Sequence, residues 1–77
     1  MNSQADYQMI LEEALEQLRE RAEQIQPVTA YEEGKLMAYY EILSGMMNQA
    51  RLVGLEPDDI GLRGFRPEAL LKKRQAA

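Results

Sequence analysis

Hydrophobic residues recur at helical spacing in a first long stretch, from about residue 4 to residue 26. The repeat consists of Tyr7, Leu11, Ala14, Leu18, Ala22 and Ile25, with Ile10 and Leu15 beside it. Side chains that recur every three or four positions lie on one face of an α-helix. Charged side chains, most of them acidic, occupy many of the remaining positions, so the stretch predicts an amphipathic helix with an acidic outer face.

A second stretch, from about residue 30 to residue 53, is apolar over more than half of the helix circumference. One row consists of Leu36, Tyr39, Leu43, Met46, Ala50 and Val53, and a second strip consists of Ala38, Ile42, Gly45 and Leu52. A helix with two apolar sides needs cover from more than one neighbour. We therefore expect this helix to lie at the centre of the fold.

Helix-stop and helix-capping residues mark the ends of these stretches. Pro27 stops the first helix, and Thr29 with Glu32 matches the S/T-x-x-E capping box at the start of the second. Gly54 follows the last apolar position of the second helix, where a left-handed residue commonly ends a helix. Because only a few residues connect the two helices, we expect them to lie antiparallel as a hairpin.

Beyond the second helix, the apolar residues lose their helical spacing. They are Leu55, Ile60, Leu62 and Phe65, and we expect them to pack this segment against the hairpin. One possible contact surface is the second apolar strip of the second helix. Pro57 and Gly61 predict one turn of helix. A last short helix is expected over residues 67–74, with Leu70 and Leu71 facing inward.

The predicted fold is all-α: an antiparallel hairpin of about residues 4–26 and 30–53, followed by short C-terminal helical segments. All of it belongs to a single small domain, residues 1–77, and we expect residues 1–3 and 75–77 to fray. A domain of this size buries only about 60% of the surface that its unfolded chain exposes. Its stability as a monomer is therefore marginal.

Oligomerisation is the remaining means of stabilisation. The chain has no cysteine for a disulfide, and the absence of both cysteine and histidine excludes the usual structural zinc sites. We therefore expect a homodimer in which two hairpins form a four-helix bundle around the second strip. Ile42, Gly45 and Leu52 are its predicted partner-binding residues.

The composition argues against an enzyme. Without histidine and cysteine, the chain lacks the commonest general base, the thiolate nucleophile and the best transition-metal ligands. Ser44 and Lys35 are nine positions apart and lie on opposite sides of a helix, so they do not form a dyad. No glycine-rich phosphate loop is present. We predict no catalytic residue, no cofactor and no metal ligand.

The net charge of −4 is unevenly distributed. Residues 1–33 carry eight acidic and two basic side chains, whereas residues 60–77 carry five basic and one acidic. The acidic face includes Glu12, Glu16 and Glu20, which are candidates for binding a basic protein surface. The basic cluster consists of Arg63, Arg66, Lys72, Lys73 and Arg74, and it could contact the acidic helix within the chain or across a dimer.

No segment approaches the roughly 18 consecutive apolar residues of a membrane span. The amino-terminal residues do not combine a basic start with an apolar run, so we expect no signal peptide. Together with the lack of cysteine, these features favour a cytoplasmic protein.

The run Tyr31-Glu32-Glu33-Gly34-Lys35-Leu36-Met37-Ala38-Tyr39-Tyr40-Glu41-Ile42-Leu43-Ser44, followed by Gly54-Leu55 and Asp59-Ile60-Gly61-Leu62, resembles a small group of bacterial and phage helical proteins. The resemblance covers about residues 31–62. No activity is assigned to that group, so the resemblance implies a bacterial or phage origin and says nothing about site residues.

Three functions are consistent with these features. The favoured hypothesis is a non-enzymatic, homodimeric protein–protein interaction module. The first alternative is an acidic inhibitor, of the immunity, antitoxin or phage type, that binds a basic partner. The second is a small nucleic-acid-binding regulator, which is less favoured because Phe65 is the only aromatic residue within the basic cluster.

Overall fold

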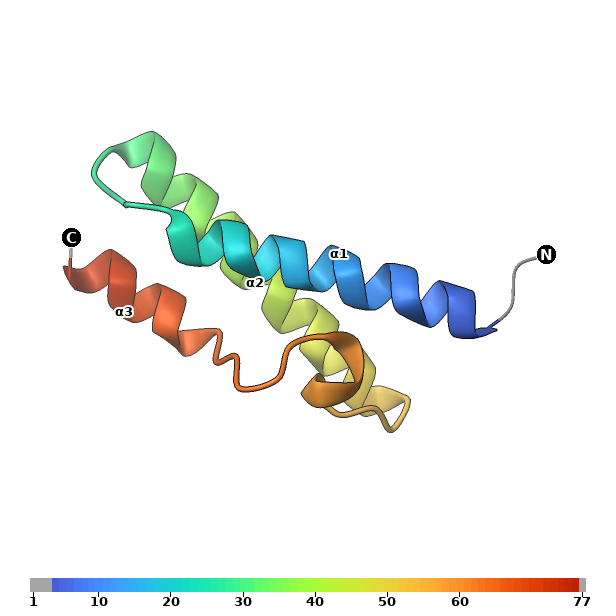
Figure 1. Ribbon diagram of the computed structural model, residues 1–77. Helices are drawn as coiled ribbons and strands as arrows, with labels where there is room; N and C mark the ends of the chain where they lie inside the picture. Colours follow the sequence, from blue (N-terminus) through green and yellow to red (C-terminus); the bar gives the residue numbers. More distant parts are fainter. Residues whose placement is uncertain (1–3, 77) are drawn as a thin grey trace.

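The computed structural model describes the backbone of residues 4–76 and the side chains of residues 4–73 (Figure 1). Its elements are α1 (Gln4–Gln24), α2 (Ala30–Leu52), the 3₁₀ helix η1 (Pro57–Ile60) and α3 (Glu68–Ala76). Residues 4–76 contain no strand. The predicted all-α fold, a helical hairpin followed by short C-terminal helices, is confirmed, whereas the dimer involves a second chain and stays a prediction.

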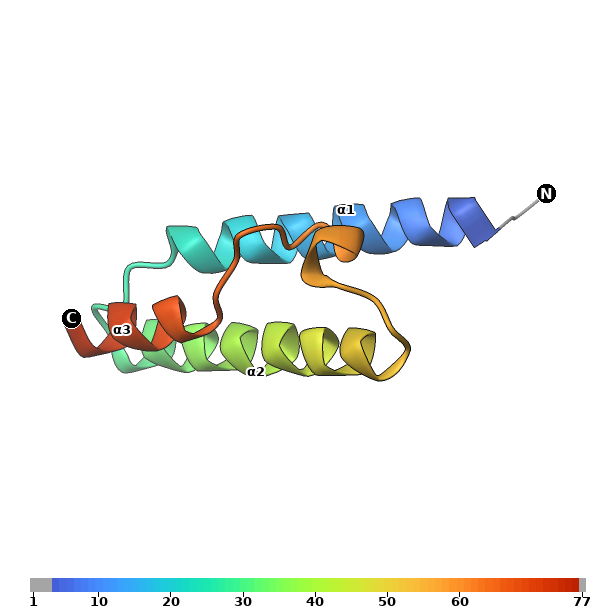
Figure 2. The same cartoon turned by 90° about the horizontal axis from the view of Figure 1, so that it is seen from below.

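The two long helices form the hairpin, and the C-terminal segment runs back along one side of it. Figure 2 shows α1 and α2 as two layers, with η1 and α3 packed beside them. The first turns of α1 extend beyond the end of α2 in both views. We call this end of the hairpin the open end, and the end with residues 25–29 the loop end.

The hairpin turn follows the predicted capping chemistry. The backbone N–H of Glu32 donates to Oγ1 of Thr29 over 3.2 Å, and the same hydroxyl donates to the Glu32 carboxylate, also over 3.2 Å. The first bond is the one that the capping box predicts for Thr29, whereas the Glu32 carboxylate accepts from the Thr29 hydroxyl instead of from its backbone N–H. The preceding helix ends at Gln24, before Pro27 removes a backbone donor.

Gly54 ends α2 in the left-handed conformation, with φ at 81°. The N–H of Leu55 donates to the carbonyl of Ala50 over 2.8 Å, and the N–H of Gly54 donates to the carbonyl of Arg51 over 3.1 Å. This pair of bonds is the Schellman motif, which satisfies carbonyl groups that the helix leaves unpaired. The predicted stop at Gly54 is therefore confirmed.

The remaining helix ends lie within two residues of their predicted positions. The hairpin helices end at Gln24 and Leu52, against predictions of about 26 and 53. The last helix begins one residue after Pro67 and includes residues 75 and 76, two of the positions at which we expected fraying. The expectations for residues 1–3 and 77 lie outside the described residues.

The core is built from both long helices and the C-terminal segment. Its buried members are Leu15, Ala22, Ile25, Leu36, Leu43, Met47, Ala50, Ile60, Leu62, Phe65 and Leu70. The prediction that Ile60, Leu62 and Phe65 pin the C-terminal segment onto the hairpin is confirmed, although Leu55 stays exposed. Leu70 is buried in α3 and Leu71 is half-buried, as expected.

Two expectations about burial were wrong. Tyr7, Ile10, Ala14 and Val53, which we assigned to the inner rows, are exposed. The row of α1 that faces the core instead runs through positions 11, 15, 18, 22 and 25, of which Leu11 and Leu18 are half-buried at its edge, and this turns Tyr7, Ile10 and Ala14 away from the core. In addition, the C-terminal segment does not cover the second strip of α2, because it packs on the other side of that helix.

Candidate protein-binding surfaces

The hairpin has one side that its own chain covers. On α1, Glu12 and Glu16 approach Gly61 so closely that a Cβ there would lie 2.7 Å from the Glu12 carbonyl oxygen. On α2, Met47 and Arg51 line a hollow together with Phe65 of the C-terminal segment. We call this side the covered face, and the opposite side of the hairpin the open face.

The open face is apolar along most of its length. Helical spacing turns its α1 residues away from Glu12 and Glu16, and its α2 residues away from Met47 and Arg51. It consists of Tyr7, Ile10, Leu11, Ala14 and Leu18 of α1 and Tyr39, Ile42, Met46 and Val53 of α2. Tyr7 is 62% exposed, Ile10 63%, Ile42 50% and Val53 73%.

An apolar groove marks the open-end half of this face. It has a volume of about 210 Å³ and is lined by Leu11, Met46, Gln49, Ala50, Val53, Leu55 and Ile60. A second hollow, of about 250 Å³, shares Leu11, Leu55 and Ile60 with it and reaches Tyr7. Asp59 also lines this second hollow, so an acidic group lies at the open end.

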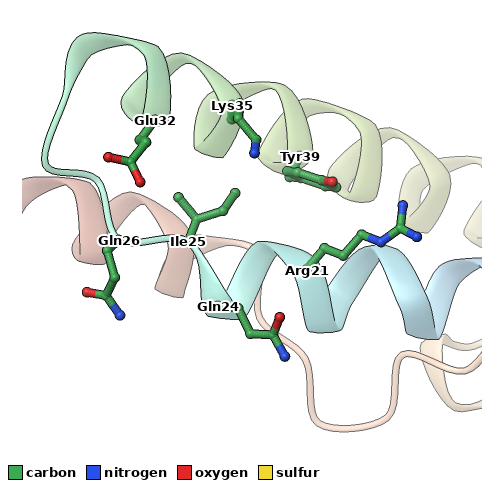
Figure 3. A pocket seen from close by; sticks show the side chains of 7 residues that line it. All are labelled: Arg21, Gln24, Ile25, Gln26, Glu32, Lys35 and Tyr39. Atoms are coloured by element: carbon green, nitrogen blue, oxygen red, sulfur yellow. The ribbon is translucent and has the colours of Figure 1, made fainter.

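The loop-end half of the open face carries a net positive charge instead, from two cations and one carboxylate. Figure 3 shows side chains from both helices around a hollow of about 340 Å³, lined by Arg21, Gln24, Ile25, Gln26, Glu32, Lys35 and Tyr39. Lys35 and Tyr39 point from α2 toward α1. The Nζ of Lys35 lies 5.5 Å from the centre of the Tyr31 ring, a cation–π distance that holds this ammonium group near the loop end.

The partner-binding residues predicted on α2 are exposed, but they do not all share one side. Ile42 lies on the open face, and Leu52 is 80% exposed. A Cβ at Gly45 would meet no atom within 4 Å. Gly45 and Leu52 lie roughly 60–80° around the helix from Ile42, given 3.6 residues per turn.

The predicted acidic residues Glu12, Glu16 and Glu20 lie together, yet they do not form a purely acidic surface. They line one hollow with Arg19, Glu23, Asp58, Gly61 and Arg63. Arg19 pairs with Glu23 over 3.3 Å and donates to the carbonyl of Arg63 over 2.6 Å. Two arginines therefore offset part of the acidic charge.

The basic C-terminal cluster contacts the acidic helix within the same chain. The Nζ of Lys73 donates to the backbone carbonyl of Glu23. Arg63 forms an ion pair with Asp58 over 3.3 Å. One of the two predicted arrangements, contact within the chain, is therefore present, although Lys73 binds a carbonyl rather than a carboxylate. The side chain of Arg74 lies outside the described residues.

Within the described residues, no three acidic side chains are grouped so that they could hold a metal ion. No helix of residues 4–76 has the length and apolar character needed to cross a membrane. The chain was compared with protein-family models, curated proteins and solved structures, and none of them matches it.

Sequence reasoning missed the α1 half of the open face. The signal is present: Tyr7, Ile10 and Ala14 follow a spacing of three and four, beside a separate row at positions 11, 15, 18, 22 and 25. We merged these two strips into one face. A wide apolar face can equally be one broad buried side or two adjacent strips, so the pattern alone could not separate them.

Proposed function

We propose that this protein is a non-enzymatic helical interaction module that works as a homodimer, with two hairpins packed through their open faces. The observation that carries the proposal is the contrast between the two sides of the hairpin. The chain's own C-terminal segment occupies the covered face, whereas Tyr7, Ile10, Ile42 and Val53 remain exposed on the open face. Exposed apolar side chains gathered on one face are typical of an interaction surface.

One long side of the molecule is large enough to form an interface with a second copy of the chain. A stable interface buries about 800 Å² on each partner. The described residues measure 44 × 23 × 16 Å, so a long side presents an area of roughly 700–1,000 Å². Burial of apolar surface contributes about 25 cal/mol per Å² before the costs of association, so contact over this area supports a dimer.

In the proposed dimer, α1 and α2 of each chain form the four central helices, and η1 and α3 lie on the outside. Each hairpin is then covered on both sides, once by its own C-terminal segment and once by its partner. The two-sided apolar character of α2 supports this arrangement, because its row facing α1 is buried while Ile42 and Val53 are exposed on the open face.

The test is the solution mass of wild-type protein and of two matched variants, measured by sedimentation equilibrium over a concentration series. Ile42→Glu introduces a charge into the open face, whereas Leu52→Glu introduces the same charge at an exposed leucine outside it. We expect wild-type protein and Leu52→Glu to have twice the chain mass of 8.8 kDa, and Ile42→Glu to be a helical monomer.

Each result bears on a different surface. A fully helical wild-type monomer at tens of micromolar would overturn the homodimer. If Leu52→Glu is the monomer and Ile42→Glu remains a dimer, the interface lies on the side of α2 that carries Gly45 and Leu52, away from Ile42.

The two alternatives have less support. An acidic inhibitor would use Glu12, Glu16 and Glu20, but the same hollow contains Arg19 and Arg63. For nucleic-acid binding, part of the basic cluster has other contacts: Lys73 binds a carbonyl of α1 and Arg63 pairs with Asp58. The interaction module therefore remains the preferred function.

A further inference from the structure

The two ends of the open face differ in charge. At the loop end, Arg21 and Lys35 line the same hollow as one carboxylate, Glu32, so the net charge of its lining is positive. At the open end, Asp59 of the η1 turn lines the hollow beside Tyr7. Glu56 precedes this turn, and its backbone N–H donates to the Asp59 carboxylate over 2.8 Å. The face therefore has a net positive charge at one end and is bordered by carboxylates at the other.

Two hairpins can pack face to face about a two-fold axis in two ways. An axis parallel to the helices places the loop end of one chain over the loop end of the other, which brings Arg21 and Lys35 close to the same residues of the second copy. An axis across the helices places the loop end of one chain over the open end of the other, which brings these cations toward the partner's acidic open end. Like charges across an interface are unfavourable and opposite charges are favourable.

Taking the proposed homodimer as given, we infer that the second copy lies antiparallel on the open face, with the loop end of each chain over the open end of the other. In this arrangement α1 packs on the partner's α1, and α2 packs on the partner's α2. The charge complementarity of the two ends selects this orientation.

The register follows from which residues of α1 and α2 lie at the same height. Leu11 and Met46 line one groove, so Ala14 lies roughly level with residue 43. An axis through Ala14 is central on α1, because it relates position 7 to 21 and position 10 to 18. Ala14 is small and exposed, so the two α1 helices can approach closely there.

The side chains that this axis brings together are compatible. Ile10 meets the partner's Leu18, which places apolar groups together. Arg21 comes near the partner's Tyr7, where a guanidinium can lie over an aromatic ring. On α2, where the axis passes near position 43, Ile42 lies between the partner's Ile42 and the partner's Met46, and a thioether adapts readily to an aliphatic neighbour. The face is thus self-complementary in the placement of its apolar and aromatic groups as well as in charge.

Disulfide cross-linking tests this orientation without background, because the chain has no cysteine of its own. Ala14→Cys is oxidised alone, and Leu18→Cys is mixed separately with Ile10→Cys and with Tyr39→Cys. These substitutions leave Arg21, Lys35 and Asp59 unchanged. The antiparallel arrangement predicts cross-linked dimer for Ala14→Cys and for the Ile10/Leu18 mixture, since a disulfide needs Cβ atoms about 4 Å apart.

The opposite orientation predicts a different pattern. An axis parallel to the helices places α1 over the partner's α2, where Leu18 lies level with Tyr39, so the Leu18/Tyr39 mixture would cross-link instead. That result, with wild-type protein dimeric by sedimentation, overturns the orientation and leaves the homodimer standing. A monomeric wild-type protein overturns both. A dimer that cross-links in none of these experiments removes the interface from the open face.

Discussion

Gly61 shows how a single residue determines where the C-terminal segment can lie. Its φ of 79° is left-handed, and it follows η1 directly. A Cβ at this position would lie 2.7 Å from the carbonyl oxygen of Glu12, which belongs to the backbone of α1 and cannot rotate away. Only glycine combines this backbone conformation with so close an approach.

We therefore expect Gly61→Ala to lower the free energy of unfolding by about 3 kcal/mol, from left-handed strain together with the steric contact. This change in the free energy of unfolding is measured by urea unfolding, with both proteins at the same fixed concentration. Gly34→Ala is the matched control, because a Cβ at Gly34 in α2 would meet no atom within 4 Å. Alanine is the better helix former, so the control should gain about 1 kcal/mol. Equal effects of the two substitutions would contradict this account of Gly61.

Ser44 provides a second prediction at the scale of one residue. Its Oγ is buried and has no hydrogen-bond partner among the described residues. A buried hydroxyl without a partner loses its hydration without compensation. We expect Ser44→Ala to raise the free energy of unfolding by about 1 kcal/mol, measured by urea unfolding. A loss of stability would indicate that the hydroxyl has a partner that the described contacts do not include.

At the scale of the helices, local chemistry explains why the sequence predicted the boundaries well. Pro27, Thr29 and Gly54 act through bonds and backbone angles within a few residues of themselves. Thr29 caps α2 and Gly54 ends it, each by hydrogen bonds that the sequence pattern predicts. The bounds of η1 are also determined by local residues, because Pro57 begins the turn and Gly61 follows its end.

The exposed surfaces of the helices were harder to predict. The pattern of α1 indicated its apolar residues but not which of two adjacent strips would face α2. Leu15 is buried, whereas Ala14, its neighbour in sequence, is exposed. The choice depends on the rotation of α1 about its own axis, which is determined by contacts with α2 and with the C-terminal segment rather than by α1 itself.

For the whole molecule, the proposed dimer links stability to protein concentration. A species that binds only the folded state stabilises it in proportion to the logarithm of its concentration. We expect a roughly tenfold increase in protein concentration, worth about 1.4 kcal/mol, to raise the Tm of the wild-type dimer by about 3–6 °C.

The open-face variant supplies the control for this measurement. The Tm of Ile42→Glu, followed by circular dichroism, should not change with concentration, because this variant is expected to remain monomeric. A Tm of wild-type protein that is independent of concentration would contradict a dimer whose dissociation is coupled to unfolding.

The sequence by itself determined the all-α class, the hairpin, its boundaries and the role of the apolar residues after Gly54. These features depend on helical periodicity, capping and turn chemistry, which act over a few residues. Only the tertiary structure decided that the C-terminal segment covers one face of the hairpin and leaves Tyr7, Ile10 and Ile42 exposed on the other. That outcome depends on how α1, α2 and residues 57–73 compete for the same apolar surfaces, and such competition between distant segments is not encoded in the spacing of any one of them.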